Sequence, residues 1–479
     1  MFERYPKLRD IVRDRFPYIL VDEYQDTAPE VMDILLGFLP QSSRRGIVGF
    51  FGDAMQSIYS DSGGDILSQV ELGNIIEVKK EQNRRNPRLI FELANRLRYD
   101  GIVQRASEDA AAPNMREGKV KDGTIRFYYT TGVNQDLGAV RRHLGWDFFD
   151  VAETKELNLT HNLIAPQAGF GDLMAIYDKD GVLHFRDRIV DHIKKYHDLL
   201  EFTGLTFEAT IASLQKGKTG AALRAVSPTP AMRDFITMHP HLLADANGRD
   251  FEGFRQMYVN KELLIGEKKH SDQEVARRGS SRCEFIEHIF RIREIAHLYE
   301  TGRYNEFLRK TEFKLSKASD KLILKNYIEA IYGMANRPVI EIVELADRHG
   351  LCRIDDTLLD FKNRKPYLYE RVKSVPYRSF MSLYDYLEGR TGYSTQHKIK
   401  GLEFERVLVV LDSGDWNKYN FAYLFEGQGT ESVLNRTRKL FYVCCTRAKD
   451  TLAVYYHQPS EKTLAQAREW FGSDNCVSL

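Results

Sequence analysis

Near the start of the chain stand Tyr18-Ile19-Leu20-Val21-Asp22-Glu23-Tyr24-Gln25-Asp26-Thr27. The apolar residues 18–21 predict a short buried β-strand, and two adjacent carboxylates, Asp22 and Glu23, follow it directly. In an α/β nucleotide site, a metal-binding Asp and a water-activating Glu belong at such a strand end. Taken alone, an Asp-Glu pair after a strand is more often a helix start, so the nucleotide assignment depends on other residues.

A second apolar run is also followed directly by polar residues. Residues 47–51 predict another buried strand, which ends in Gly52-Asp53-Ala54-Met55-Gln56. Between the two runs, Thr27 and Glu30 have the spacing of a helix capping box. Strand, helix and strand, with polar groups where the strands end, predict an α/β fold with its site at the carboxyl edge of the sheet.

A Gly-rich phosphate-binding loop with Lys and Ser or Thr should precede the first strand, and residues 1–17 do not contain one. We therefore expect an ATP-driven motor that lacks its front part, so that the first lobe is incomplete. Residues 212–219, which end in Gly217-Lys218-Thr219, fit a permissive form of the loop pattern. They follow the carboxylate strand and have no clear buried strand before them, so a polar turn between helices is predicted there instead.

Composition sets broad limits. With 479 residues, 43% of them hydrophobic and 29% charged, the chain is predicted to be an ordinary globular protein of two to four domains. Its net charge of +1 means that any nucleic-acid groove must come from local clustering of charge. The five cysteines have no metal-binding spacing, which favours a reducing cytoplasm. No apolar run approaches the ~20 residues of a membrane span, so no membrane partner is expected.

The rest of the chain alternates between strand-like and helical segments. Residues 124–129, 157–165, 407–411 and 451–456 predict strands of a second α/β lobe, and residues from roughly 200 to 385 show helical stripes. The predicted domains are the C-terminal part of a first lobe at 1–76, a second lobe at 77–200 and 386–479, and a mainly helical insertion at 201–385.

Five motifs in this order resemble those of superfamily 1 DNA helicases of the UvrD/Rep/PcrA type. They comprise residues 22–27, residues 52–59, the polar cluster around Asn83 and Arg85, Thr395-Gln396-His397-Lys398-Ile399-Lys400-Gly401-Leu402-Glu403-Phe404, and residues 440–449. A single match is weak, whereas five in the correct order are specific. The resemblance implies two RecA-like lobes of the P-loop NTPase class with a helical insertion, and 3′-to-5′ DNA helicase activity driven by ATP and Mg²⁺.

The resemblance also implies roles for individual residues. Asp22 holds Mg²⁺, Glu23 activates water, and Gln56 senses the γ-phosphate, which Arg85 and Arg447 contact from the second lobe. The remaining assignments are Arg84, Gly401 and Glu403 for the nucleotide, and Tyr59, Thr395 and His397 for single-stranded DNA. A capping carboxylate at Glu403 and a satisfied interior histidine at His397 remain alternatives.

Two departures from the family pattern stand out. Arg84 occupies the position of the aromatic residue that packs on adenine, although a guanidinium also stacks on flat rings. After Tyr59, residues 60–64 read Ser-Asp-Ser-Gly-Gly in place of the usual Trp-Arg-Gly, so one base-stacking platform is missing.

Three explanations of the missing loop stay open: a fragment of a longer frame, a split enzyme completed by a protein that supplies the loop, or a non-hydrolysing DNA-binding scaffold. The expected nucleic-acid partner is single-stranded and partly duplex DNA. The family serves repair, plasmid replication and phage defence, and the sequence does not choose among them.

Overall fold

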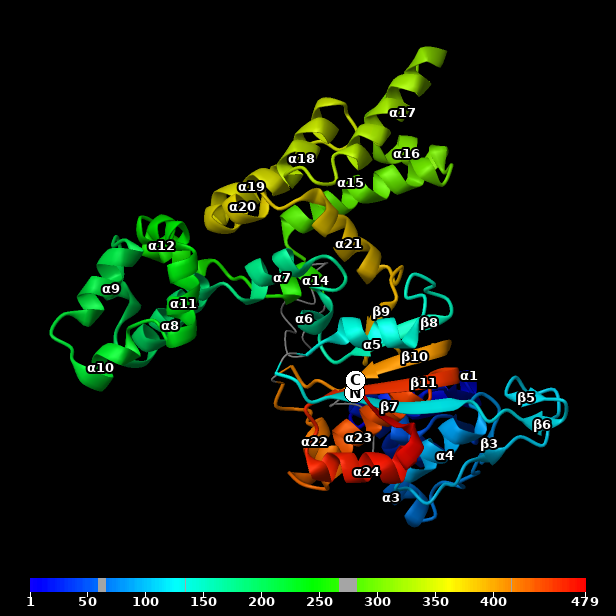
Figure 1. Ribbon diagram of the computed structural model, residues 1–479. Coiled ribbons are helices and arrows are strands. Elements are labelled where there is room, and N and C mark those ends of the chain that lie inside the picture. The colour runs from blue at the N-terminus through cyan, green and yellow to red at the C-terminus, as the bar shows by residue number, and fades with distance from the viewer. Residues whose placement is uncertain (59–65, 134, 267–281, 415) are drawn as a thin grey trace. The chain divides into compact units, whose positions relative to one another are not determined.

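The computed structural model describes residues 1–58, 66–133, 135–266, 282–414 and 416–479. The chain divides into two compact units (Figure 1). One unit contains residues 1–164 and 391–479, and the other contains residues 165–390. The helical unit thus begins earlier than the predicted insertion at 201, while the predicted boundary between lobes at 76 remains a prediction.

A six-stranded sheet forms the centre of the first unit. Its spatial order is β12-β7-β11-β10-β8-β9, and every neighbouring pair is parallel. The strands are β7 (Thr124–Thr130), β8 (Thr154–Asn158), β9 (Tyr393–Thr395), β10 (Phe404–Val410), β11 (Ala448–His457) and β12 (Cys476–Ser478). The sheet therefore combines strands from residues 124–158 with strands from residues 393–478, and its parallel pairs are joined by crossover connections.

Alternating side chains along these strands build a core on each face of the sheet. Phe127, Val407 and Val454 point to one face, where they pack with α4 (Arg88–Leu97), α22 (Phe421–Glu426), α23 (Glu431–Cys445) and α24 (Glu461–Phe471). Tyr128, Leu408 and Tyr455 point to the other face, against α5 (Leu137–Leu144). Covered on both sides, the central strands β10 and β11 contain the continuous apolar runs at 407–410 and 452–456.

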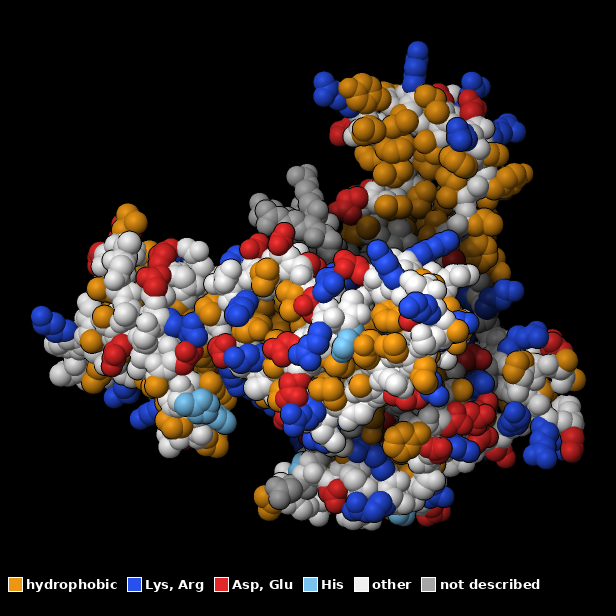
Figure 2. Space-filling view, turned by 90° about the horizontal axis from the view of Figure 1, so that it is seen from above, with side chains coloured by type: hydrophobic (Ala, Val, Ile, Leu, Met, Phe, Trp, Pro, Cys, Tyr) orange, Lys and Arg blue, Asp and Glu red, His pale blue; other side chains and the backbone are white. Residues whose placement is uncertain are grey.

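The N-terminal segment is a separate strand-helix-strand element. β1 (Tyr18–Val21) pairs in parallel with β2 (Ile47–Phe50), preceded by α1 (Lys7–Arg15) and joined through α2 (Pro29–Asp33) and a π-helical turn at Ile34–Phe38. Both predicted strands are present, but the prediction that they are buried is wrong, because no residue of β1 or β2 is buried. Tyr18 and Leu20 are 71% and 67% exposed, and hydrophobic side chains gather on this segment, at the top of Figure 2.

Beyond β2, the chain packs into the core of the large sheet. Met55 and Ile58 are 1% and 2% exposed and belong to the same hydrophobic cluster as α4 and α23. Residues after the second strand are therefore anchored by apolar burial against the large sheet and its helices.

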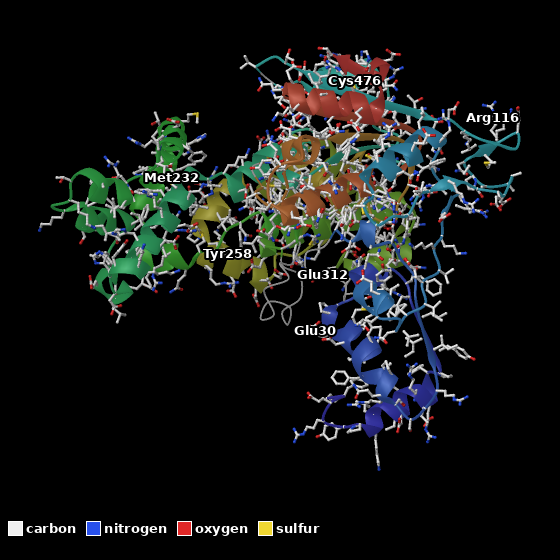
Figure 3. All side chains as sticks on the ribbon, turned by 90° about the horizontal axis from the view of Figure 1, so that it is seen from below. Glu30, Arg116, Met232, Tyr258, Glu312 and Cys476 are labelled. Atoms are coloured by element: carbon white, nitrogen blue, oxygen red, sulfur yellow. The ribbon has the colours of Figure 1, made fainter. Side chains whose placement is uncertain are left out.

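Smaller elements complete this unit. β3 (Gln82–Asn83) pairs with β4 (Arg105–Ala106), and β5 (Met115–Arg116) with β6 (Lys119–Val120) forms a short hairpin that contains the labelled Arg116 (Figure 3). α3 (Ile66–Glu71) and α6 (His161–Ile164) are short helices. The predicted strand at 157–165 is wrong beyond its first two residues, because β8 (Thr154–Asn158) ends at Asn158 and α6 begins at His161.

The second unit is helical, as the stripes predicted. Its helices are α7 (Gly171–Asp178), α8 (Gly181–Tyr196), α9 (Phe207–Gln215), α10 (Gly220–Ala225), α11 (Pro230–Met238), α12 (Pro240–Asn247), α13 (Phe251–Gln256), α14 (Glu262–Ile265), α15 (Glu284–Glu300), α16 (Tyr304–Lys310), α17 (Ala318–Gly333), α18 (Val339–Arg348), α19 (Asp356–Arg364), α20 (Pro366–Val372) and α21 (Tyr377–Leu387). Across the described ranges, no helix is both long enough and apolar enough to cross a membrane.

One buried ion pair in the sheet gives a stability prediction. Glu156 on β8 is fully buried and accepts two hydrogen bonds from Arg141 on α5, at 2.7 and 2.8 Å. Arg141→Met should lower the free energy of unfolding by about 3–5 kcal/mol, because it leaves a buried carboxylate without its cation. Urea denaturation measures the change.

Arg142→Met is the matched control. The Arg142 side chain is 74% exposed and lies 3.5 Å from Asp136, so its loss should change stability by no more than about 0.5 kcal/mol. Equal effects of the two substitutions would contradict a structural role for the buried pair.

Candidate nucleotide site

The acidic residues lie together where β1 and β2 end. Asp22 and Glu23 follow β1, and Asp53 comes three residues after the end of β2. Between them lies Gln25, whose side chain is buried and which donates from Nε2 to Glu23 Oε2 and accepts at Oε1 from the Asp53 amide, at 3.2 Å. One amide side chain therefore ties the two strand ends to each other.

Glu23 has a strained backbone. Its φ of 50° and ψ of 47° lie in the left-handed region, which few residues other than glycine adopt. Such strain costs about 1–3 kcal/mol, persists only where surrounding contacts impose it, and clusters at functional sites. Here the contacts are the Gln25 hydrogen bond and the bond from the Tyr24 amide to the Phe51 carbonyl at 3.1 Å.

Asp53 is linked to the part of this unit that contains α4 and α23. Arg98, which follows α4, donates to both Asp53 oxygens at 2.9 and 3.0 Å, and its side chain is 4% exposed. Arg98 also donates to the Tyr442 hydroxyl at 2.7 Å and pairs with Asp100. Burial raises the pKa of Asp53, but the Arg98 hydrogen bonds outweigh it, so the pKa lies below its ordinary value and the carboxylate stays charged.

Lys400 makes a second link. Its ammonium group lies 3.3 Å from Glu23 Oε2, pairs with Asp26, and donates to the Gln56 carbonyl at 3.0 Å. The Lys400 side chain is only 9% exposed. The segment 395–404 thus places a cation directly against the carboxylates that follow β1.

Two arginines approach the same place from the large sheet. Arg447 is 1% exposed, and its Nη2 lies 3.5 Å from Gln56 Oε1, while Nε donates to the Val443 carbonyl at 3.0 Å. Burial and the neighbouring Arg85 lower the pKa of Arg447 to about 10, so it remains a cation at neutral pH. Arg85 donates from Nε to Glu403 Oε2 at 2.6 Å.

The structure therefore brings Glu23, Gln56 and Arg447 together, with Asp22 next in the chain and Arg85 close enough to Arg447 to perturb it. Arg84 is instead paired with Asp109 at 2.6 Å, with 58% of its side chain exposed. Gly401 has a φ of 82°, and a Cβ there would meet nothing within 4 Å.

The predicted DNA-facing residues have different surroundings. Tyr59 lies outside the described residues. Thr395 is buried in β9 at 4% exposure. His397 is part of an aromatic cluster: its Nε2 lies 2.7 Å from the Tyr419 hydroxyl, and its ring centroid is 5.7 Å from that of Trp416, which is 36% exposed.

Sequence reasoning assigned no role to Lys400, Gln25, Arg98 or Trp416. Lys400 stood inside a quoted motif, so its position gave a signal that was not used. Arg98 gave no signal, because only the folded chain brings it to Asp53.

The Gly217-Lys218-Thr219 turn has the predicted form. Helix α9 ends at Gln215 and α10 begins at Gly220, so a helix precedes the turn where a phosphate loop would need a strand. Lys218 Nζ lies 3.5 Å from His192 Nε2 within the helical unit.

Two segments of the chain match known families. Residues 1–73 match the UvrD/REP helicase N-terminal domain, and residues 389–459 match the UvrD-like helicase C-terminal domain. These matches support a UvrD-like superfamily 1 helicase relationship. They cover the segments that contain Glu23, Gln56, Lys400 and Arg447.

Two curated proteins are similar along nearly the whole chain. Gabija protein GajB of Bacillus cereus (strain HuB5-5) is 23% identical over 496 residues, which cover 98% of this chain and 63% of that protein. ATP-dependent DNA helicase PcrA of Staphylococcus aureus (strain MRSA252) is 22% identical over 482 residues, which cover 95% of this chain and 57% of that protein. The chain thus spans about three fifths of the length of these relatives.

A substitution at Gly52 tests the tie between the strand ends. A Cβ at this position would collide with Gln25 Oε1 and lie 2.8 Å from the Tyr24 ring. Gly52→Ala should therefore displace the Gln25 amide and destabilise the β1–β2 element by about 1–3 kcal/mol. Hydrogen exchange of peptides from residues 18–58 reports the local effect.

Gly37→Ala is its control, because Gly37 lies in a helical turn and a Cβ there would meet nothing within 4 Å. It should leave stability unchanged or raise it by about 0.4–1 kcal/mol. If Gly52→Ala exchanged no faster than the parent chain, Gln25 would not be what holds the strand ends together.

Proposed function

We propose that this chain forms part of an ATP-dependent 3′-to-5′ DNA helicase with RecA-like lobes, in which the β1–β2 element and the large sheet each supply one side of the nucleotide site. The observation that carries the proposal is the contact of Gln56 with Arg447 beside the strained Glu23. Phosphoryl transfer to water needs a group that orients the water and cations that offset charge on the departing phosphate. PcrA, named an ATP-dependent DNA helicase, aligns with 95% of the chain, which supports the same reading.

The proposed roles follow from the contacts. Glu23 accepts the proton of the attacking water, and Gln56 and Arg447 act on the γ-phosphate. Arg85 adds a second cation. If Arg85 left Glu403 to bind phosphate, nucleotide binding would be coupled to the motif at 395–404. Lys400 holds the Glu23 and Asp26 carboxylates in place and keeps the two sides joined.

Magnesium fits this site only together with a nucleotide. Within the described ranges, no group of three or more His, Cys, Asp or Glu side chains could hold a metal ion. Mg²⁺ in ATP sites is commonly held by one or two carboxylates plus phosphate oxygens and water. The exposed Asp22 can supply one such carboxylate, and the ion would neutralise charge on the phosphates.

Single-stranded DNA is the proposed polymer substrate. Trp416, which is 36% exposed, can offer a ring to DNA bases, and stacking on such a ring tolerates any sequence. His397 and the buried Tyr419 pack against it from the segments that follow β9 and β10. Thr395, being buried, would act on DNA only through backbone position.

Hydrolysis is proposed to need a phosphate-binding loop that these 479 residues do not contain. The purified chain should therefore hydrolyse ATP negligibly with or without single-stranded DNA, because loss of such preorganised electrostatics costs orders of magnitude in rate. DNA-stimulated turnover in the ordinary enzyme range of ~1–10³ per second would contradict this. DNA binding with no ATP turnover in any form of the protein would favour the scaffold alternative.

In a form that hydrolyses ATP, Glu23→Gln should keep ATP affinity but lose at least ~10²-fold in rate, the usual scale for a positioned proton acceptor. Glu30→Gln is the matched control, since Glu30 is an exposed glutamate at the start of α2. Lys218→Ala should change ATP affinity by less than about threefold. Near-normal turnover of the Glu23 variant would remove it from the chemistry.

A further inference from the structure

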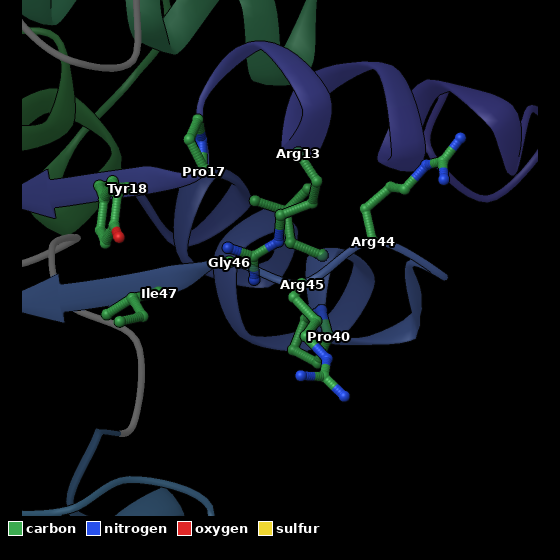
Figure 4. Close-up of a pocket in the computed structure, with 9 residues that line it drawn as sticks. Arg13, Pro17, Tyr18, Pro40, Arg44, Arg45, Gly46 and Ile47 are labelled. Carbon is green, nitrogen blue, oxygen red and sulfur yellow. The ribbon is translucent and has the colours of Figure 1, made fainter.

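A cavity lies at the opposite ends of β1 and β2 from the carboxylates. Its volume is about 620 Å³, and it is lined by the start of each strand, at Tyr18 and Ile47, by Arg13 of α1, and by Pro40 and Arg45 (Figure 4). β1 spans four residues, so this cavity is separated from Asp22 by the length of the strand, about 13 Å. None of the site residues discussed above lines it.

Arg13 is the unusual residue of this cavity. Its side chain is buried, with the residue 6% exposed, and neither Nε nor Nη1 has a hydrogen-bond partner. Figure 4 shows the Arg13 side chain descending from α1 and ending beside Gly46. A buried guanidinium that lacks partners is costly, and such groups are normally paired with an anion.

The absence of a side chain at Gly46 leaves room for the Arg13 guanidinium. A Cβ at Gly46 would lie 2.6 Å from Arg13 Nη1 and 2.9 Å from the Pro17 carbonyl. Only glycine at position 46 therefore lets the guanidinium lie against the start of β2.

Charge and shape indicate the ligand class. The lining contains three arginines and no acidic residue. Arg44 extends away from the strands in Figure 4 and pairs with Asp14 at 3.2 Å, whereas Arg45 lies beside Pro40. Tyr18, Ile47 and Pro40 add apolar walls, and 620 Å³ exceeds what a bare phosphate needs but falls within the range of small-molecule sites.

We propose that this cavity binds a mononucleotide-sized phosphate monoester, with the phosphate on Arg13 and Arg45 and the organic part against Tyr18 and Ile47. Arg13 would act on the phosphate through the positive charge of its buried guanidinium, which no acidic residue of the cavity lining offsets. The site is distinct from the proposed nucleotide site at the carboxyl ends of the strands. Because it is formed by α1, β1 and β2, ligand binding would stabilise the same element that carries Glu23.

Isothermal titration of the full chain at low ionic strength tests the proposal with three probes: AMP, inorganic phosphate and adenosine. AMP should bind best, phosphate more weakly, and adenosine not measurably. Arg13→Gln should weaken AMP binding at least tenfold, whereas Arg44→Gln, the matched control on the rim, should weaken it less than threefold. AMP should also raise the thermal midpoint of the parent chain and of Arg44→Gln, but not that of Arg13→Gln.

A second pair of variants keeps the test valid if Arg13→Gln does not fold. Arg13→Lys keeps a cation but replaces the planar guanidinium with a more strongly hydrated ammonium group, and Arg45→Gln removes the other cation; each should weaken AMP binding at least threefold. The proposal is overturned if AMP does not bind, if adenosine binds as well as AMP, or if Arg13→Gln and Arg44→Gln behave alike. One further result would overturn the proposal: a single-stranded oligonucleotide that displaces AMP from the parent chain but not from Arg44→Gln. Displacement that depends on Arg44 would place AMP on the exposed rim instead of on Arg13.

Discussion

The hydrogen-bonded pair of Asp53 with Arg98 is the interaction on which the arrangement of the site depends. Both Asp53 oxygens are engaged, the Arg98 side chain is 4% exposed, and the Tyr442 hydroxyl donates to Asp53 at 3.1 Å. The pair joins the loop after β2 to α4 and α23. Breaking it by removing one partner would leave the other charge buried, which is strongly destabilising. The anchor is reinforced by Met55 and Ile58, which lie in the core of the large sheet.

Because the strands are parallel, a few contacts are enough to assemble the acidic residues and the cations of the site. Their carboxyl ends meet at one edge, so Asp22, Glu23 and Asp53 are neighbours as soon as β1 and β2 pair. In the large sheet, residues 395–404 lead into β10, and residues 440–449 lead into β11. These two strands are also parallel partners. Lys400 and Arg447 then bridge the two edges through Glu23, Asp26 and Gln56.

Much of this could be predicted from sequence, because it depends on local patterns. The apolar runs that end in Asp22 and Asp53 predicted strands with acidic ends, and the helical stripes predicted the helical unit. The strand at 157–165 was mispredicted, because its apolar residues continue past Asn158 into α6 and periodicity alone does not separate the two.

Contacts between distant segments were not predictable from pattern. Lys400 and Asp26 are 374 positions apart, and Arg98 and Asp53 are 45 apart, so only folding reveals these pairs. The proximity of Gln56 to Arg447 was expected from the family resemblance alone. Arg13 looked like one more charged residue of an amphipathic helix, and its burial became visible only with Gly46 beside it.

In the proposed mechanism, the β1–β2 element and the large sheet act on one γ-phosphate through Gln56 and Arg447. A double-mutant cycle with Gln56→Ala and Arg447→Ala, measured as the ratio of ATP to ADP affinity in a form of the enzyme that hydrolyses ATP, tests it most directly. We expect a coupling energy of about 0.5–3 kcal/mol between the two substitutions, as for residues in one network. Strictly additive effects would contradict it, because the two side chains would then act on the nucleotide independently.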